Sequence, residues 1–229
     1  MNWIRVALVA CVAALAWAAL PNRTVIVDTH GATRQLIIAS TLARVDDPIV
    51  VLGDSIVEGS TLPRSLCGHA IVNAGIGGAS TASHLGSVLK EALAAKRAAL
   101  IIVSLGTNDA AVPMSVEQYR TNYRGLLAEL DALAPRRAIA AIPPPEAGLP
   151  EAKKVRPPVI DSYNAILPAL AEEARAAFIP LPPMPEHHTL DGIHLNAAGY
   201  EEWEGRPRHY RRSTLQIDLK ASQMSCRLA

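Results

Sequence analysis

The fold of this chain is most clearly indicated by the segment ALIIVSL, Ala99–Leu105, which is followed directly by GTND, Gly106–Asp109. The segment is rich in β-branched residues, and polar residues do not alternate with apolar ones. This pattern is typical of a strand that a parallel sheet buries on both faces. Similar shorter runs occur at Ile49–Leu52, Ala70–Asn73, Arg137–Ile142 and Ala177–Leu181. The sequence therefore predicts a parallel sheet of about five strands.

Segments with helical periodicity separate these strands. Apolar residues recur at helical spacing in Ser80–Lys96, Val116–Leu133 and Pro158–Ala176, and a final helix is expected from Ala197 to Trp203. Alternating strands and helices imply βαβ units, whose helices cover the two faces of the sheet. We therefore expect an α/β fold, a three-layer α/β/α sandwich.

Polar clusters stand at the predicted carboxyl ends of three strands and just before the final helix. They are GDSIVEG at Gly53–Gly59, NAGIGG at Asn73–Gly78, GTND at Gly106–Asp109 and DGIHLN at Asp191–Asn196. Open parallel sheets bind ligands outside the carboxyl ends of their strands. We therefore expect the four clusters to meet and to form the functional site.

The residue types in these clusters suit nucleophilic catalysis. A serine hydroxyl becomes an effective nucleophile when a base takes its proton, and histidine titrates near working pH. A carboxylate against the imidazole fixes its tautomer and stabilises the imidazolium. Asp191 and His194 are three residues apart, so a single turn can present both side chains on one side.

In order and character, the four clusters resemble the four sequence blocks of the SGNH hydrolases, also called the GDSL esterase/lipase family. The resemblance extends from about Ile49 to about Trp203 and implies a flavodoxin-like strand order. It also implies that Ser55 is the nucleophile, His194 the base and Asp191 its supporting carboxylate. The implied oxyanion donors are the backbone N–H groups of Ser55 and Gly78 and the side-chain amide of Asn108. No metal or cofactor is implied.

Several of these residues and their neighbours also have structural interpretations. A serine after a strand often caps a helix, so Ser55 alone would be a weak signal. We expect Asp54 to stabilise its loop by bonding to the backbone, and Glu58 to be an exposed charge in the first turn of a helix. His187 and His188 are expected at the solvated rim of the site.

Two other kinds of site fit the sequence poorly. The glycine-rich stretch Gly75–Gly78 follows the second predicted strand, whereas a dinucleotide-binding loop follows the first. Ser55 does not lie in a G-x-S-x-G elbow, which argues against the ordinary α/β-hydrolase arrangement.

Composition excludes further classes. The 229-residue chain has a formal net charge of +1 and only 4% aromatic residues, so nothing indicates a nucleic acid partner. Its cysteines, Cys11, Cys67 and Cys226, form no C-x-x-C pair, which argues against a thiolate metal site. Cys67 could pair with Cys226 in an oxidising compartment, although a lone thiol is the simpler interpretation.

The N-terminus predicts export. Arg5 precedes the apolar run Val6–Leu20, which is short for a membrane span but suits the apolar region of a signal sequence. We expect residues 1–20 to be a signal peptide or a signal anchor, so that the protein is periplasmic or extracellular and, in the second case, attached to the membrane through residues 6–20.

The rest of the chain divides into three parts. We expect residues 21–47 to be a linker or N-terminal extension with a short strand at Thr24–Val27, and residues 48–204 to be the catalytic domain. Residues 205–229 form a basic C-terminal tail without clear periodicity.

These observations predict a serine esterase that hydrolyses carboxylic esters of small molecules, glycans or lipids through an acyl-serine intermediate. The scarcity of aromatic residues and the small side chains of Ala79–Thr81 favour short acyl or acetyl groups. One alternative is a cell-envelope O-acyltransferase on the same scaffold, in which a sugar hydroxyl replaces water. Another is a non-catalytic binding domain. The sequence does not define the oligomeric state.

Overall fold

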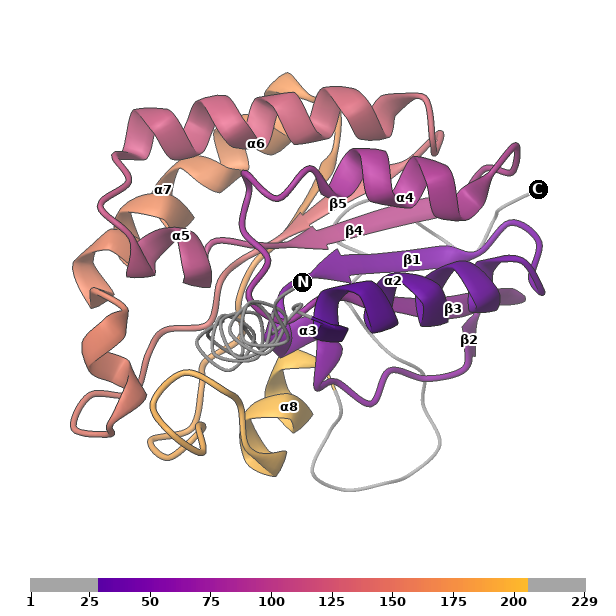
Figure 1. The fold of residues 1–229 in the computed structure, drawn as a ribbon. Coiled ribbons are helices and arrows are strands. Elements are labelled where there is room, and N and C mark those ends of the chain that lie inside the picture. The colour runs from indigo at the N-terminus through magenta and orange to yellow at the C-terminus, as the bar shows by residue number, and fades with distance from the viewer. Residues whose placement is uncertain (1–28, 206–229) are drawn as a thin grey trace, which may run out of the picture.

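A six-stranded sheet forms the centre of the computed structural model, which describes residues 29–205 (Figure 1). Its strand order is β2-β3-β1-β4-β5-β6. The strands are β1 (Ile49–Gly53), β2 (Ser65–Leu66), β3 (His69–Gly75), β4 (Leu100–Ser104), β5 (Arg137–Ala140) and β6 (Ala177–Ile179). The five parallel strands follow the order β3-β1-β4-β5-β6, which is the flavodoxin-like arrangement. The predicted fold class and the predicted parallel strands are thereby confirmed.

The sixth strand, β2, extends the predicted sheet. It contains two residues and pairs antiparallel with β3, so that the two strands form a hairpin at the sheet edge. The turn between them contains Cys67 and Gly68, both with positive φ. A strand this short has no periodicity that sequence reasoning could detect.

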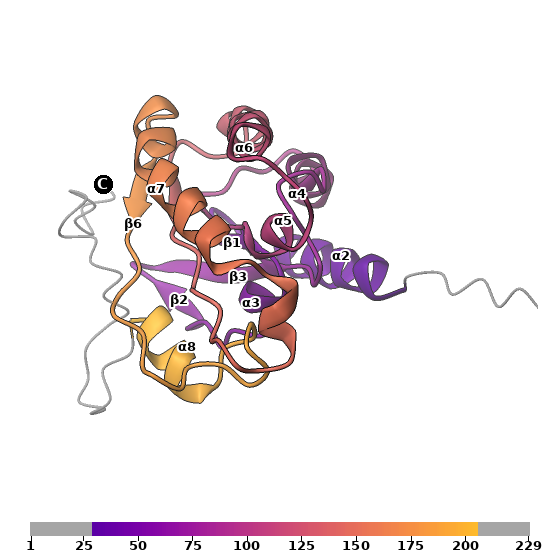
Figure 2. The ribbon, with the colours of Figure 1, turned by 90° about the vertical axis from the view of Figure 1, so that its left-hand side faces the viewer.

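Helices cover the two faces of the sheet unequally in the described part of the chain (Figures 1 and 2). The helices are α2 (Thr29–Leu42), α3 (Ser55–Glu58), α4 (Leu85–Leu93), α5 (Thr107–Ala111), α6 (Val116–Asp131), α7 (Pro157–Glu173) and α8 (Ala197–Trp203), with a 3-10 turn η1 (Glu151–Lys154). The larger apolar core lies between the sheet and the helices α2, α4, α6 and α7. A smaller core lies on the opposite face, where Val57 of α3 and Trp203 of α8 pack against the strands.

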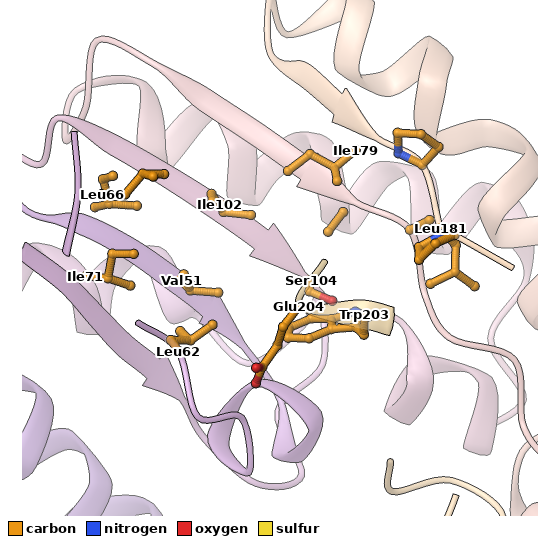
Figure 3. A pocket seen from close by; sticks show the side chains of 15 residues that line it. Val51, Leu62, Leu66, Ile71, Ile102, Ser104, Ile179, Leu181, Trp203 and Glu204 are labelled. Atoms are coloured by element: carbon orange, nitrogen blue, oxygen red, sulfur yellow. The ribbon is translucent and has the colours of Figure 1, made fainter. Parts of the chain in front are cut away.

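An apolar pocket remains on this second face. Figure 3 shows Val51 and Ile102 of the sheet, together with Leu62 and Trp203, among the side chains that line it. Ser55, Asp191 and His194 do not line it. This pocket is therefore distinct from the place where the predicted catalytic residues gather.

Residues 29–42 correct the expectation of a linker before residue 48. They form α2, and Ile38 and Leu42 on one side of this helix are buried in the larger core. Leu36 and Ile37 are 72% and 48% exposed. Apolar residues therefore occur on both the buried and the exposed side of α2, which obscures the amphipathic pattern that normally reveals a surface helix.

Several predictions fall outside the described residues. They concern the leader at 1–20, the strand at Thr24–Val27 and the tail after residue 205. Cys67 is disulfide-bonded, so the lone-thiol interpretation is wrong; both other cysteines lie outside the described range. No helix within residues 29–205 is long and apolar enough to cross a membrane.

Candidate active site

Ser55 stands at the carboxyl end of β1, where the chain turns directly from strand to helix. A Cβ on Gly53 would lie 2.3 Å from a methyl carbon of Val57 and 2.6 Å from the carbonyl oxygen of Ser104, so this tight turn requires glycine. The Asp54 carboxylate accepts the N–H of Ile56 at 2.9 Å and caps α3. Ser55 is therefore the first residue of a short, well-anchored helix.

The three residues of the predicted triad lie in one hydrogen-bonded row. Ser55 Oγ lies 2.9 Å from His194 Nε2, and His194 Nδ1 lies 2.6 Å from Asp191 Oδ2. When His194 is neutral with the proton on Nδ1, it donates to Asp191, and Nε2 can accept the proton of the serine hydroxyl. The structure thus brings together side chains that are 139 residues apart in sequence.

The turn from Asp191 to His194 is organised by its own carboxylate. Asp191 Oδ1 accepts the backbone N–H groups of Ile193 and His194, each at 2.9 Å. Partial burial opposes ionisation of Asp191, but the hydrogen bonds from the His194 side chain and from these N–H groups outweigh it and lower its pKa. Asp191 is therefore a carboxylate at neutral pH.

Two further predicted residues, Gly78 and Asn108, are linked by a contact of Asn108 with the loop after β3. Asn108, in α5, donates from Nδ2 to the carbonyl oxygen of Ala79 at 2.8 Å, so it lies beside the residue that follows Gly78. The amide nitrogen carries two hydrogens, and this bond uses one of them. Gly78 has a φ of +79°, and a Cβ there would meet no atom within 4 Å, so its surroundings are open. Both groups have N–H donors available for a ligand.

Two buried carboxyl groups, those of Asp54 and Asp109, belong to the same sequence clusters as Ser55 and Asn108. Burial raises the pKa of Asp54 to about 7, and the nearby negative charge of Asp109 contributes in the same direction. Asp109 accepts hydrogen bonds from the backbone N–H and the hydroxyl of Thr81, but burial raises its pKa as well. Their contacts are with the loops that carry Ser55 and Thr81, which agrees with the structural role expected of Asp54.

Glu58 differs from its expected role as an exposed helix charge. Only 20% of its side chain is exposed, and Oε2 accepts the N–H of Gly77 at 2.6 Å. His30 and Arg34 of α2 also contact its carboxylate. The sequence could not indicate these contacts, because they depend on a helix that was expected to be a linker.

The histidine pair before Asp191 is only partly as expected. His187 is exposed and pairs with Glu146. His188 is buried, with 6% exposure, and its ring nitrogens lie 2.8 and 2.9 Å from the carbonyl oxygens of Pro185 and Pro144. His188 therefore joins two loops and does not form part of a solvated rim.

Glu146 is a residue of the site region that sequence reasoning missed. It lies in the loop after β5 and accepts hydrogen bonds from the His187 ring, from the N–H groups of His188 and Thr189, and from the Thr189 hydroxyl. The hydrogen bond from His187, followed by those from Thr189, lowers its pKa to about 2. Its own N–H donates to the carbonyl oxygen of Gly192. An isolated glutamate in a proline-rich loop carries no sequence signal of such contacts.

Within residues 29–205, the structure contains no group of three or more His, Cys, Asp or Glu side chains that could hold a metal ion. The arrangement of Ser55, His194 and Asp191 can support proton transfer from a hydroxyl to an imidazole. The N–H groups of Gly78 and Asn108 are donors of the kind that suits a developing negative charge.

Comparison with known proteins defines the class. The profile of the GDSL-like Lipase/Acylhydrolase family matches residues 51–202. The chain therefore belongs to this family, and it is a hydrolase that acts on ester bonds. No curated protein matches the chain at a significant level.

Solved structures with the same fold include three bacterial proteins. A protein from Streptococcus pneumoniae described as a platelet activating factor has a TM-score of 0.67 at 24% identity, over 91% of this chain and 98% of its own. A lipase/acylhydrolase from Enterococcus faecalis has a TM-score of 0.60 at 18% identity, over 80% and 99%. An acetylxylan esterase from Geobacillus stearothermophilus has a TM-score of 0.54 at 17% identity, over 79% and 95%. At these identities the likeness shows the fold.

Proposed function

We propose that this hydrolase is a serine esterase that cleaves short acyl or acetyl esters through an acyl-serine intermediate at Ser55. The observation that carries the proposal is the row of contacts from Ser55 Oγ to His194 Nε2 at 2.9 Å and from His194 Nδ1 to Asp191 Oδ2 at 2.6 Å. These distances suit a nucleophile with its base and a base with its orienting carboxylate.

The reaction proceeds in two halves. Ser55 Oγ attacks the ester carbonyl carbon while His194 takes the hydroxyl proton at Nε2. The ionised Asp191 stabilises the imidazolium that forms, and His194 then gives the proton to the departing alkoxide. In the second half His194 takes a proton from water, which attacks the acyl group, and Ser55 regains its proton as the acid leaves.

Negative charge on the carbonyl oxygen needs donors during both halves. The backbone N–H groups of Ser55 and Gly78 and the second N–H of Asn108 serve this role in the proposed mechanism. The first hydrogen of the Asn108 amide is held by Ala79, so the amide is fixed before substrate arrives. Donors fixed in advance stabilise the charged intermediate without reorganising during the reaction.

A preference for short acyl groups rests on the small side chains beside the donors. The loop after Gly78 continues as Ala79, Ser80 and Thr81, and its buried Thr81 is fixed by Asp109. An acetylxylan esterase among the structural neighbours is consistent with an acetylated glycan as substrate.

Hydrolysis of p-nitrophenyl acetate and butyrate by the wild-type protein and by Ser55→Ala tests the proposal. We expect turnover that disappears in the variant and a higher kcat/KM for acetate than for butyrate. A preference for butyrate would contradict the short-acyl specificity. Turnover that survives in Ser55→Ala would contradict the role of Ser55.

The same assay with an added oligosaccharide distinguishes the acyltransferase. Acetate released to water in proportion to nitrophenol supports the esterase. Acetyl groups that appear on the oligosaccharide, with little free acetate, would assign the alternative function to the same residues.

We also propose that the protein acts outside the cytoplasm. Arg5 and the apolar run Val6–Leu20 support export. Fractionation of expressing cells tests this, because recovery in the cytoplasmic fraction with an intact N-terminus would contradict it. Recovery in the membrane fraction with residues 6–20 retained would favour the anchored form.

A further inference from the structure

We propose that Glu58 is a positioning residue that holds the glycine-rich loop at the end of β3 in the conformation needed to stabilise the oxyanion; this loop comprises residues 75–78, of which Gly75 is the last residue of the strand. This inference deepens the proposed function and rests on it, because Gly78 is one of the proposed oxyanion donors. Glu58 is the last residue of α3, the short helix that begins with Ser55. The nucleophile and the support of the oxyanion loop thus lie at the two ends of one helix.

The Glu58 carboxylate is bonded directly to the loop. Oε2 accepts the N–H of Gly77 at 2.6 Å, a short hydrogen bond to a charged acceptor. His30 Nε2 lies 3.0 Å from the same oxygen, and Arg34 Nε lies 3.4 Å from Oε1. The carboxylate is therefore fixed from the side of α2 while it holds the loop.

Arg34 holds the beginning of the same loop. Its Nε donates to the carbonyl oxygen of Gly75 at 2.9 Å, and its Nη2 donates to the carbonyl and side-chain oxygens of Asn73, both at 3.3 Å. Asn73 in turn donates to the carbonyl oxygen of Val57 in α3 at 2.7 Å. The pair Arg34–Glu58 thus contacts the loop at two backbone positions, one before and one after Ile76.

This loop needs external support because of its composition. Glycine has few intrinsic conformational preferences, and three of the four residues at 75–78 are glycine. Gly78 itself has a φ of +79°. The direction of its N–H therefore depends on how the preceding peptides are held, and the N–H of Gly77 is held by Glu58.

A purely structural role for Glu58 predicts a different result. Only 20% of the Glu58 side chain is exposed, so its bonds to Gly77 and to α2 also contribute to stability, but that contribution alone would leave kcat of the folded protein unchanged. An oxyanion donor displaced by about 1 Å can cost about 10²-fold in rate. A positioning role therefore predicts that loss of Glu58 lowers kcat of the folded protein, while KM for p-nitrophenyl acetate changes little.

Glu58→Ala and Glu58→Gln in the full-length protein test the inference. We expect kcat of Glu58→Ala to fall about 10- to 100-fold with KM nearly unchanged. Glutamine retains an oxygen that can accept the N–H of Gly77, so it should restore most of the lost turnover. Glu173→Ala is the matched control, because Glu173 also forms an ion pair, with Arg124 in α6, and lies at the end of α7. Its kcat should equal that of the wild type.

Two readouts separate positioning from general destabilisation. Amide hydrogen exchange of the peptide containing residues 75–78 should become faster in Glu58→Ala, while exchange in β4 stays unchanged. The affinity of methylboronic acid, which forms a tetrahedral adduct with a serine nucleophile, should fall in parallel with kcat/KM. Arg34→Ala should show part of the same effect, and the double variant should lose less than the sum of the two single losses.

Unchanged loop exchange in Glu58→Ala overturns the inference whether or not the protein hydrolyses esters. A wild-type value of kcat in Glu58→Ala overturns it as well. So does a lower kcat in Glu58→Ala that is accompanied by a lower unfolding temperature and that is not restored in Glu58→Gln. Failure of the proposed function shows separately, as absence of Ser55-dependent turnover in the wild type.

Discussion

Replacing Asn108 by alanine probes the proposed oxyanion site with the smallest change to the triad. Asn108 is the second residue of α5 and is not bonded to Ser55, His194 or Asp191 among the described contacts. Its side chain makes one hydrogen bond, to the carbonyl oxygen of Ala79 at 2.8 Å, and offers one further N–H. The substitution therefore removes one bond of the resting protein and one proposed bond to the transition state.

These two losses differ in size and can be measured separately. Loss of the bond to Ala79 should cost about 1 kcal/mol in the free energy of unfolding. Loss of one donor to the oxyanion costs about 2.7–4 kcal/mol in the activation free energy, so kcat should fall roughly 10²- to 10³-fold. KM for p-nitrophenyl acetate should change little, because the bond strengthens only as the charge develops.

Steady-state kinetics and urea unfolding of Asn108→Ala provide the two measurements, with Asn122→Ala as a control. Asn122 is a half-buried residue of α6 that accepts a hydrogen bond from Gln118 and donates one to the sulfur of Met114, and it has no bond to the triad among the described contacts. Its variant should retain wild-type kcat. If kcat of Asn108→Ala stays within about three-fold of the wild type, Asn108 does not stabilise the oxyanion. A raised KM with unchanged kcat would assign it to substrate binding alone.

Three further predictions concern the supporting residues. Asp191→Asn keeps the shape of the side chain but favours the wrong tautomer of His194, so kcat should fall about 10⁴-fold; a loss below ten-fold would remove Asp191 from the triad. Gly75→Ala places a Cβ 2.2 Å from the backbone nitrogen of Glu58, so α3 must shift at a cost of about 1–3 kcal/mol; an unchanged unfolding temperature would contradict this contact. Glu146 has a pKa of about 2 in the folded protein against 4.5 ordinarily, so its contribution to stability is present above pH 4.5 and is lost as the pH falls toward 2. Urea unfolding should show the stability difference between wild type and Glu146→Gln shrinking over this range, and a constant difference would contradict the lowered pKa.

The sequence predicts the parallel strands well because each is a continuous apolar run that a sheet buries on both faces. The segment Ala99–Leu105 contains the observed strand β4, Leu100–Ser104. The helix α6 also begins at the predicted residue, Val116, because Ser115 provides a clear N-cap through its bond to Gln118. Strong local patterns of this kind do not depend on the rest of the chain.

Elements without such a pattern could not be predicted. Helix α2 has Leu36 and Ile37 on its exposed side, so its apolar residues do not define one face. Strand β2 is too short for any period, and it forms because β3 offers an edge for pairing. The predicted helix Ser80–Lys96 begins only at Leu85, since the residues before it form turns bonded through Ser83.

In the candidate active site, too, some residues could be predicted from local sequence patterns and others could not. The types and spacing of Ser55, Asp191 and His194 could be recognised, because each lies in a short motif and the chemistry needs those groups. The supporting contacts of Glu58 and Glu146 could not, because they join residues 19 and 43 positions apart through loops whose packing leaves no local trace.

Whether Ser55 carries the acyl group during turnover can be measured directly, from the mass of the protein trapped while it hydrolyses substrate. The wild type is mixed with p-nitrophenyl acetate and quenched with acid within milliseconds, and the peptide that contains residue 55 is isolated. An acyl-serine mechanism predicts an additional acetyl group on Ser55 that disappears as substrate is exhausted and that is absent in Ser55→Ala. An acetyl group on a different residue, or turnover without any acylated Ser55, would contradict it.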